Sequence, residues 1–106
     1  MKETLPANAG QFAERYPESW DAFTALGKAI SEQGPLDGRS RRLVKIALAM
    51  AAGSEGATHS HVRRAVAEGI SAEEIRHVAL LGVTTLGFPH AVAAMSWADD
   101  ELSGGS

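Results

Sequence analysis

Residues 69–76 read GISAEEIR, and this stretch determines how two successive helices meet. Gly69 suits the left-handed conformation that often follows the end of an α-helix, because it has no Cβ atom. Ser71 followed three residues later by Glu74 is a capping box, in which the two side chains bind the N–H groups that open a helix. The stretch therefore predicts one helix that ends near Glu68 and another that begins at Ser71.

On both sides of this stretch, apolar residues recur at the spacing of an α-helix, which predicts further helices. Pro17 suits the first turn of an early helix, and Asp37 suits the N-cap of a later one. No segment shows the alternation typical of a β-strand, so we expect an all-α fold of five or six helices. These helices are expected at residues 17–33, 39–52, 54–68, 71–86 and 89–102, with a weaker candidate at 6–16.

Length and composition predict a single compact domain. The chain has 106 residues, of which 44% are hydrophobic, enough for one modest core but not for two. We expect a helical domain over residues 17–102. A weakly helical segment at 1–16 precedes it, and a flexible tail, SGGS, follows at 103–106.

Charge and cysteine content exclude several classes of function. The formal net charge is −3, and no basic run is longer than residues 39–42, which argues against a nucleic-acid or membrane partner. The chain has no cysteine, which excludes disulfides, thiolate metal sites and thiol nucleophiles. The first residues lack the apolar run of a signal peptide, and no apolar run approaches the ~20 residues of a membrane span. We therefore expect a cytoplasmic protein.

Two leucines predict that the subunits associate. Leu80 and Leu81 lie off the main apolar stripe of the helix expected at 71–86, which gives that helix a second apolar side. A domain of this size cannot easily cover both sides, so we expect a homo-oligomer, although extra burial within the chain is an alternative.

Residues 54–61, SEGATHSH, contain the leading candidate for chemistry. Positions 54, 57 and 61 share one face of a helix, since offsets of three and seven residues nearly complete whole turns. A thiol peroxidase would need Cys, Cys and His on that face, whereas this chain has Ser54, Ala57 and His61. Disulfide-based turnover is therefore excluded, while the histidine remains.

With the helices placed, the chain resembles the carboxymuconolactone decarboxylase family, which also contains the alkylhydroperoxidase D-like proteins. The resemblance runs from about Trp20 to Leu102, and the most specific part is GISAEEI followed by GFP at 87–89. It implies an all-helical, alkylhydroperoxidase D-like fold and assembly as a trimer or hexamer. The matching residues are LD at 36–37, Arg41, LVKIALA at 43–49, HVRRA at 61–65, GISAEEIR at 69–76 and GFPHA at 87–91.

The resemblance separates two branches of this family. The peroxidase branch carries Cys-x-x-Cys-x-x-x-His here, with a proton-relay glutamate about three turns earlier. Ser54 and Ala57 stand at the cysteine positions, His61 matches the histidine, and the glutamate position falls near Arg42. The chain is more similar to the lactone decarboxylase branch, which also lacks the cysteines and keeps a His-Val-Arg run.

His61 is the predicted catalytic residue. With a pKa near neutrality on a partly buried face, it would move protons to or from a carbonyl or carboxylate substrate. The alternative is a buried histidine that is hydrogen-bonded to a neighbour. Lys45 and Arg42 are candidates for holding a substrate carboxylate. Burial would prepare Lys45 for this role, whereas a lysine that reaches solvent is the structural alternative.

Glu55 and His90 complete the candidate substrate-binding residues. Glu55 would orient a ligand, or pair with a cation on a solvated ridge that includes His59 and Arg63. His90, in the first turn of the last helix, would be a neutral donor or acceptor, because the helix dipole disfavours its charged form. His59 and His61 diverge on a helix, so we expect no metal site and no cofactor.

Three functions remain open from the sequence. The first is a cofactor-independent enzyme that acts on a small carboxylate or lactone, with His61 as general acid and base. The second is a non-catalytic oligomeric binding or scaffold protein of the same fold. The third is a peroxidase-type activity, which has no evident mechanism without a thiol.

Overall fold

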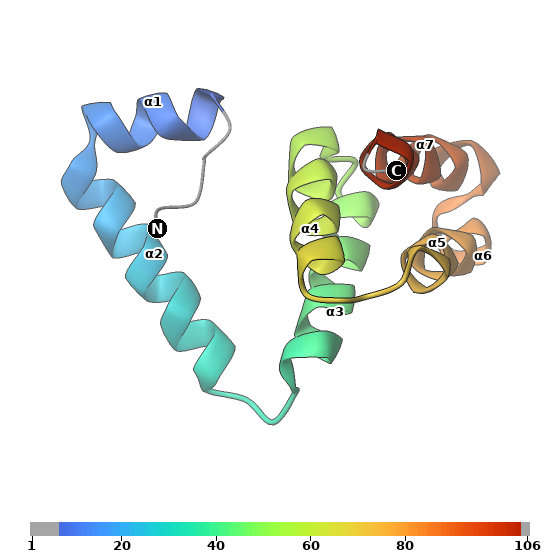
Figure 1. Cartoon of the computed structure of the whole chain (residues 1–106), viewed down its shortest axis with the longest axis horizontal. Helices are drawn as coiled ribbons and strands as arrows, with labels where there is room; N and C mark the ends of the chain where they lie inside the picture. The colour runs from blue at the N-terminus through green and yellow to red at the C-terminus, as the bar shows by residue number, and fades with distance from the viewer. Residues whose placement is uncertain (1–6, 105–106) are drawn as a thin grey trace. The chain divides into compact units, whose positions relative to one another are not determined.

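The computed structural model describes residues 7–104, which form seven α-helical segments and no strand (Figure 1). This confirms the predicted all-α class. The predicted tail at 103–106 lies partly outside the described residues, since 105–106 are not described and 103–104 continue the last helix. The helices are α1 (Ala7–Arg15), α2 (Pro17–Glu32), α3 (Gly38–Ala51), α4 (Glu55–Ala67), α5 (Ala72–Leu81), α6 (Val83–Leu86) and α7 (Phe88–Gly104).

The chain divides into two units, residues 1–35 and 36–106. In the first unit, α1 and α2 pack through aromatic rings, with the ring of Phe12 centred 5.3 Å from that of Tyr16 and 6.3 Å from that of Trp20. No residue of α2 is buried. An amphipathic helix without a covered face lacks the packing that normally stabilises it, so α2 presents apolar surface for further contacts.

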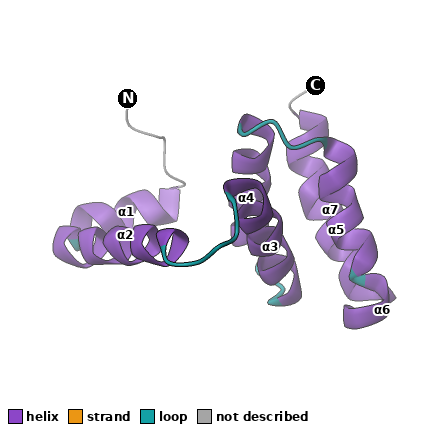
Figure 2. Cartoon of the chain, turned by 90° about the horizontal axis from the view of Figure 1, so that it is seen from below, coloured by secondary structure: helices purple, strands orange, loops and turns teal. Residues whose placement is uncertain are grey.

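The second unit contains the hydrophobic core and the candidate site. Helices α3 and α4 lie side by side, and α7 packs against α4 and α5 (Figure 2). Ile46, Met50, Val62 and Ile75 supply the largest apolar side chains of this core. The last helix contributes small residues instead, Ala91, Ala94 and Ala98, all nearly inaccessible. Small side chains allow close approach of α7 while the larger ones fill the space between helices.

Local signals place the helix ends as predicted. Asp37, Ser54 and Ser71 are the N-caps of α3, α4 and α5, and each accepts a hydrogen bond from a backbone N–H of the first turn. The predicted capping box is present, because the Glu74 side chain also accepts from the Ser71 backbone. Gly69, with φ of +89°, ends the helix before it in the left-handed region.

One helix differs from the prediction. The stretch expected as a single helix at 71–86 is interrupted at Gly82 and continues as the single turn α6. At this point backbone hydrogen bonds span three residues rather than the four of an α-helix. They run from Gly82 N to Ala79 O at 3.0 Å and from Thr85 N to Gly82 O at 3.1 Å. A Cβ at position 82 would lie only 3.2 Å from Leu86 Cδ1, so the absence of a side chain permits this close turn.

No helix within residues 7–104 is both long enough and apolar enough to cross a bilayer. This agrees with the absence of an apolar run in the sequence.

Candidate functional site

His61, Arg42 and Glu68 form a connected polar cluster between α3 and α4. Arg42 Nη1 lies 2.7 Å from His61 Nδ1. The same guanidinium binds Glu68 with two parallel contacts, Nε to Oε1 at 3.0 Å and Nη2 to Oε2 at 2.9 Å. His61 and Glu68 are seven residues apart, close to two helical turns, so both reach the side of α4 that faces Arg42.

The contact with Arg42 determines which nitrogen of His61 carries a proton. A guanidinium donates and cannot accept, so Nδ1 must be the acceptor in the 2.7 Å contact. The neutral ring therefore carries its hydrogen on Nε2. The site presents His61 as a neutral hydrogen-bond donor whose other nitrogen is occupied.

The surroundings of His61 favour its neutral form. Partial burial lowers its pKa to about 4, and the nearby charges of Arg42, Arg64 and Lys45 act in the same direction. The carboxylate of Glu68 opposes them. The pKa of His61 thus lies below the near-neutral value expected from the sequence, first because the ring is partly buried and then because cations surround it.

Glu68 was not among the predicted site residues. Its hydrogen bonds with Arg42 are the main reason that its pKa is lowered, so it stays ionised and neutralises the guanidinium. The sequence indicated only that a relay glutamate was missing near Arg42. The seven-residue spacing of His61 and Glu68 indicates that both lie on one side of the same helix. It does not predict that Arg42 of α3 lies opposite them.

Lys45 and Arg42 differ from each other in exposure. Lys45 is exposed, which is the solvent-facing alternative considered for it, yet it lies near enough to lower the pKa of His61. The side chain of Arg42 is only 17% exposed, and its donors already bind Glu68 and His61. Lys45 therefore has the more accessible charge of the two.

His90 lies in a different environment from His61. Its Nε2 is 2.7 Å from the carbonyl oxygen of Met50, so it donates a hydrogen bond to the last turn of α3. The ring also lies 3.9 Å from where a Cβ of Gly53 would be, and Gly53 has φ of +69°. The histidine thus joins the start of α7 to the turn between α3 and α4.

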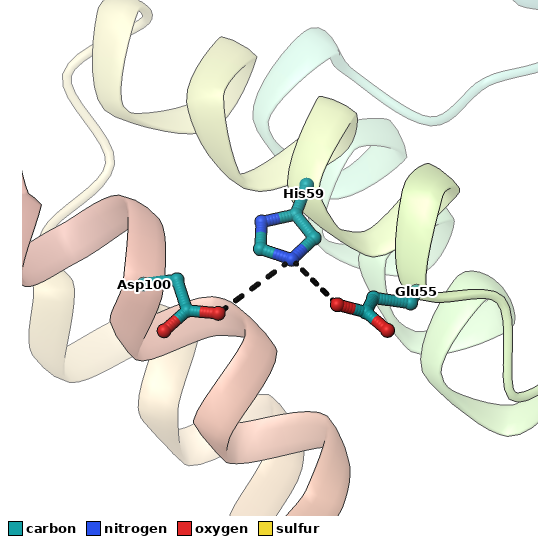
Figure 3. A group of neighbouring side chains, drawn as sticks. All are labelled: Glu55, His59 and Asp100. Carbon is teal, nitrogen blue, oxygen red and sulfur yellow. Dashed lines mark ion pairs between the residues drawn. The ribbon is translucent and has the colours of Figure 1, made fainter.

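The ridge expected at Glu55, His59 and Arg63 is only partly solvated, which corrects the prediction for His59. The His59 side chain is 19% exposed, and its Nδ1 lies 2.7 Å from Glu101 Oε2 on α7. Its Nε2 faces Glu55 at 3.4 Å and Asp100 at 3.7 Å (Figure 3). The four-residue spacing on α4 suggested that His59 is exposed to solvent. That spacing does not show that α7 packs beside the same face.

The two histidines of α4 therefore face different helices, His59 toward α7 and His61 toward α3. Ser54, at the position that matches the first cysteine of the peroxidase branch, caps α4 through a 3.2 Å contact from Ala57 N. Serine is a preferred N-cap residue, because its hydroxyl oxygen accepts from an N–H of the first turn.

A separate apolar groove of about 600 Å³ opens between α3, α5, α6 and α7. Its walls include Leu48, Leu81 and Leu86, with Glu74 and His77 among its few polar groups. Neither His61 nor Lys45 lines it. The candidate polar site and this apolar groove are thus distinct features of the second unit.

The helical fold and the His61 cluster define an all-α, cysteine-free protein in which a histidine of α4 contacts an arginine of α3. The carboxymuconolactone decarboxylase family matches residues 17–100, and the chain belongs to this family. The resemblance recognised in the sequence is thereby confirmed.

Known proteins agree with this assignment. A carboxymuconolactone decarboxylase family protein from Legionella pneumophila, solved in its apo form, superposes with a TM-score of 0.78 at 25% identity, covering 92% of this chain and 86% of that one. A candidate carboxymuconolactone decarboxylase from Burkholderia xenovorans LB400 gives a TM-score of 0.71 at 25% identity, covering 96% and 85%.

A curated relative matches a shorter segment. An uncharacterized protein of Haemophilus influenzae (strain ATCC 51907 / DSM 11121 / KW20 / Rd) is 33% identical over 56 residues, which are 53% of this chain and 50% of that protein. The chain thus spans about half the length of the curated relative that it matches.

Proposed function

We propose that this protein is a decarboxylase-like enzyme that acts on a small carboxylate or lactone with its own side chains and without a thiol. The observation that carries the proposal is the 2.7 Å contact between Arg42 Nη1 and His61 Nδ1, which leaves Nε2–H as a fixed neutral donor. Family membership supports the reaction class. The sequence assigned proton transfer to His61, and the geometry favours hydrogen-bond donation by this residue instead.

The proposed role of His61 follows from where negative charge develops during decarboxylation. When a carboxylate on a saturated carbon next to a carbonyl, or at the vinylogous position, loses CO2, the electron pair of the breaking C–C bond moves into the carbonyl π system, and negative charge grows on the carbonyl oxygen. A fixed donor aimed at that oxygen stabilises the transition state. His61 Nε2–H would serve as this donor, and a proton from water would then replace CO2 on carbon.

The neighbouring charges have separate roles in this proposal. Arg42 is a positioning residue, since its donors hold His61 and Glu68. Exposed Lys45 would attract the substrate carboxylate, because its ammonium group is near His61 and open to solvent. Glu55 and His90 interact with other parts of the chain, so this mechanism gives them no contact with substrate.

We also propose that the active protein is a homo-oligomer, a trimer or hexamer. Large apolar side chains remain exposed in both units, including Phe23 at 64%, Leu81 at 61% and Phe88 at 67%. Burial of such surface is the main driving force for stable association. A neighbouring subunit would supply the walls that His61 lacks within one chain.

The test is a screen of small carboxylates and lactones for CO2 release and for thermal stabilisation by bound ligand. We expect His61→Ala, which removes the donor, to lower kcat by about 10²-fold or more, because one donor to a developing oxyanion is worth roughly that amount. His77→Ala, which removes an exposed histidine of α5, should leave turnover unchanged. Equal activity of His61→Ala and the wild-type protein would refute the proposed role.

The scaffold alternative predicts a different result from the same screen. No turnover of any compound, together with unchanged assembly in His61→Ala, would favour a non-catalytic oligomer of this fold.

A further inference from the structure

A second polar cluster, separate from the His61 site, joins α4 to α7. It consists of Glu55 and His59 on α4 and of Asp100 and Glu101 on α7, together with Arg63. The first three of these residues place one possible ligand atom each within 4.8 Å of the other two. Figure 3 shows the carboxylates of Glu55 and Asp100 on either side of the same imidazole nitrogen of His59.

We propose that Glu55, His59 and Asp100 form a binding site for a divalent first-row transition-metal ion, of which Zn²⁺ is the best representative. The ligand atoms are His59 Nε2, one Glu55 oxygen and one Asp100 oxygen. Zn²⁺ commonly takes three such protein ligands and completes its tetrahedron with water.

The spacing of the ligand atoms suits such an ion. His59 Nε2 lies 3.4 Å from Glu55 Oε2 and 3.7 Å from Asp100 Oδ2. A tetrahedral ion with bonds of about 2.0–2.2 Å separates its ligands by about 3.3–3.6 Å. Only small side-chain adjustments would bring the three atoms to bonding distance of one centre.

The protonation of His59 leaves the correct nitrogen available. Its Nδ1 lies 2.7 Å from Glu101 Oε2, and an ionised carboxylate only accepts, so Nδ1 carries a hydrogen. Nε2, which faces the carboxylates of Glu55 and Asp100, is then the nitrogen that can bind a metal ion. A carboxylate on one nitrogen and a metal on the other is the usual arrangement around a ligating histidine.

The charge of the cluster also points to a dication. Glu55, Asp100 and Glu101 carry three negative charges, and Arg63, 3.1 Å from Glu101, carries one positive charge. Before His59 is counted, these groups sum to −2, which a divalent ion balances.

The helices that carry the ligands are held together independently of any ion. Thr58 and Val62 on α4 are fully buried, as are Ala94 and Ala98 on α7. Glu55 and His59 are one turn apart on α4, so their side chains project from the same face. Because the packed core fixes both backbones, binding would require little reorganisation.

This site differs from the metal site considered in the sequence, which paired His59 with His61. Those histidines face different helices, whereas the carboxylates that complete the His59 site come from α7. The expectation of no metal rested on residues of α4 alone. The proposal also leaves the His61 mechanism unchanged, because neither residue of the Arg42–His61 contact is a ligand.

The test is calorimetric titration of the chelator-treated full chain with Zn²⁺ and, separately, with Mg²⁺. We expect one Zn²⁺ per chain and no saturable Mg²⁺ binding, since the nitrogen ligand favours zinc. Zn²⁺ should also raise the melting temperature. Failure of the wild-type chain to bind Zn²⁺ stoichiometrically would overturn the proposal.

Substitutions at the proposed ligands and at Glu101 test where the ion binds. His59→Ala should abolish binding, and Asp100→Asn, at an exposed position that tolerates substitution, should weaken it by about tenfold or more. Glu101→Gln should weaken binding by about 10–100-fold through the second ligand shell. His77→Ala is the matched control and should bind as the wild-type protein does. Undiminished Zn²⁺ binding by Asp100→Asn and Glu101→Gln would place the ion elsewhere and refute the site.

Co²⁺ provides a spectroscopic check of the geometry. Substitution with Co²⁺ should give visible absorption bands of a tetrahedral nitrogen and oxygen environment, and these bands should be lost in His59→Ala. Bands that persist in that variant would contradict ligation by His59.

Discussion

Arg42 holds a central position in the candidate site because its planar group meets a carboxylate on one edge and an imidazole on the other. Two parallel contacts to Glu68 fix the plane of the guanidinium, and the remaining nitrogen then fixes the orientation of His61. Lysine could not reproduce this geometry, since its ammonium group offers no planar fork. The orientation and the neutral state of the histidine thus depend on one side chain of α3.

The lowered pKa of His61 predicts a pH dependence of stability. Its folded pKa of about 4 lies below the ordinary histidine value of 6.5, so the unfolded chain takes up the proton first as the pH falls. The stabilisation from neutral His61 is full above about pH 6.5 and is lost as the pH drops toward 4. We expect this loss to be about 1–2 kcal/mol, because solvent screening reduces the effect at a half-buried group.

Denaturant unfolding at several values between pH 7 and pH 4 measures this effect. His61→Gln, which cannot titrate, should show a flatter pH dependence than the wild-type protein over that interval. The lowered pKa of Glu68 contributes in the same direction but only below the ordinary glutamate value of 4.5, so the effect of His61 is seen alone at higher pH. Identical curves for the two proteins between pH 6.5 and pH 5 would contradict the lowered pKa.

Helix ends in this chain are set by local residues, and this is why sequence alone predicted them well. The side chains of Asp37, Ser54 and Ser71 each accept from the N–H group three residues further along the chain, so their patterns are visible in the sequence. The break at Gly82 was missed because the apolar spacing of residues 71–86 continues across it.

The candidate site was predicted less completely for a related reason. His61 and Arg42 were recognised from their positions on helices. The contact of Glu68 with Arg42 became apparent only from the packing of α3 beside α4. His59 was assigned to solvent because Glu101, its nearest partner, is 42 residues away in the chain. Contacts between helices determine the environments of His59 and His61. Helical periodicity in the sequence does not predict which helices pack against each other.

The capping box of α5 gives a prediction at the scale of a single element. Ser71→Ala should lower the free energy of unfolding by about 1 kcal/mol, because the Ser71 hydroxyl accepts from Glu74 N at 3.2 Å and the first turn would lose that partner. Thermal or denaturant unfolding measures the change. Ser71→Asn keeps a capping side chain and should restore most of the stability. Equal losses in both variants would show that the cap contributes little.

At the scale of the whole molecule, exposed apolar surface exceeds what a small monomer usually presents. The helix α2 buries none of its residues, and Leu26 and Ile30 are 56% and 58% exposed. In the second unit, Leu80 and Leu81 are 58% and 61% exposed, as expected for helices with two apolar sides. Such surfaces in both units favour association over a free monomer.

Sedimentation velocity at several concentrations tests this association. We expect a trimer or hexamer for the wild-type chain, with a shift to smaller species for Leu26→Glu and Leu81→Glu, because a buried charge without a partner is strongly unfavourable at an apolar interface. Gln11→Glu adds the same charge at an exposed polar position and should leave the assembly intact. A wild-type monomer at every concentration would contradict the proposed oligomer, and with it the idea that a neighbouring subunit completes the walls around His61.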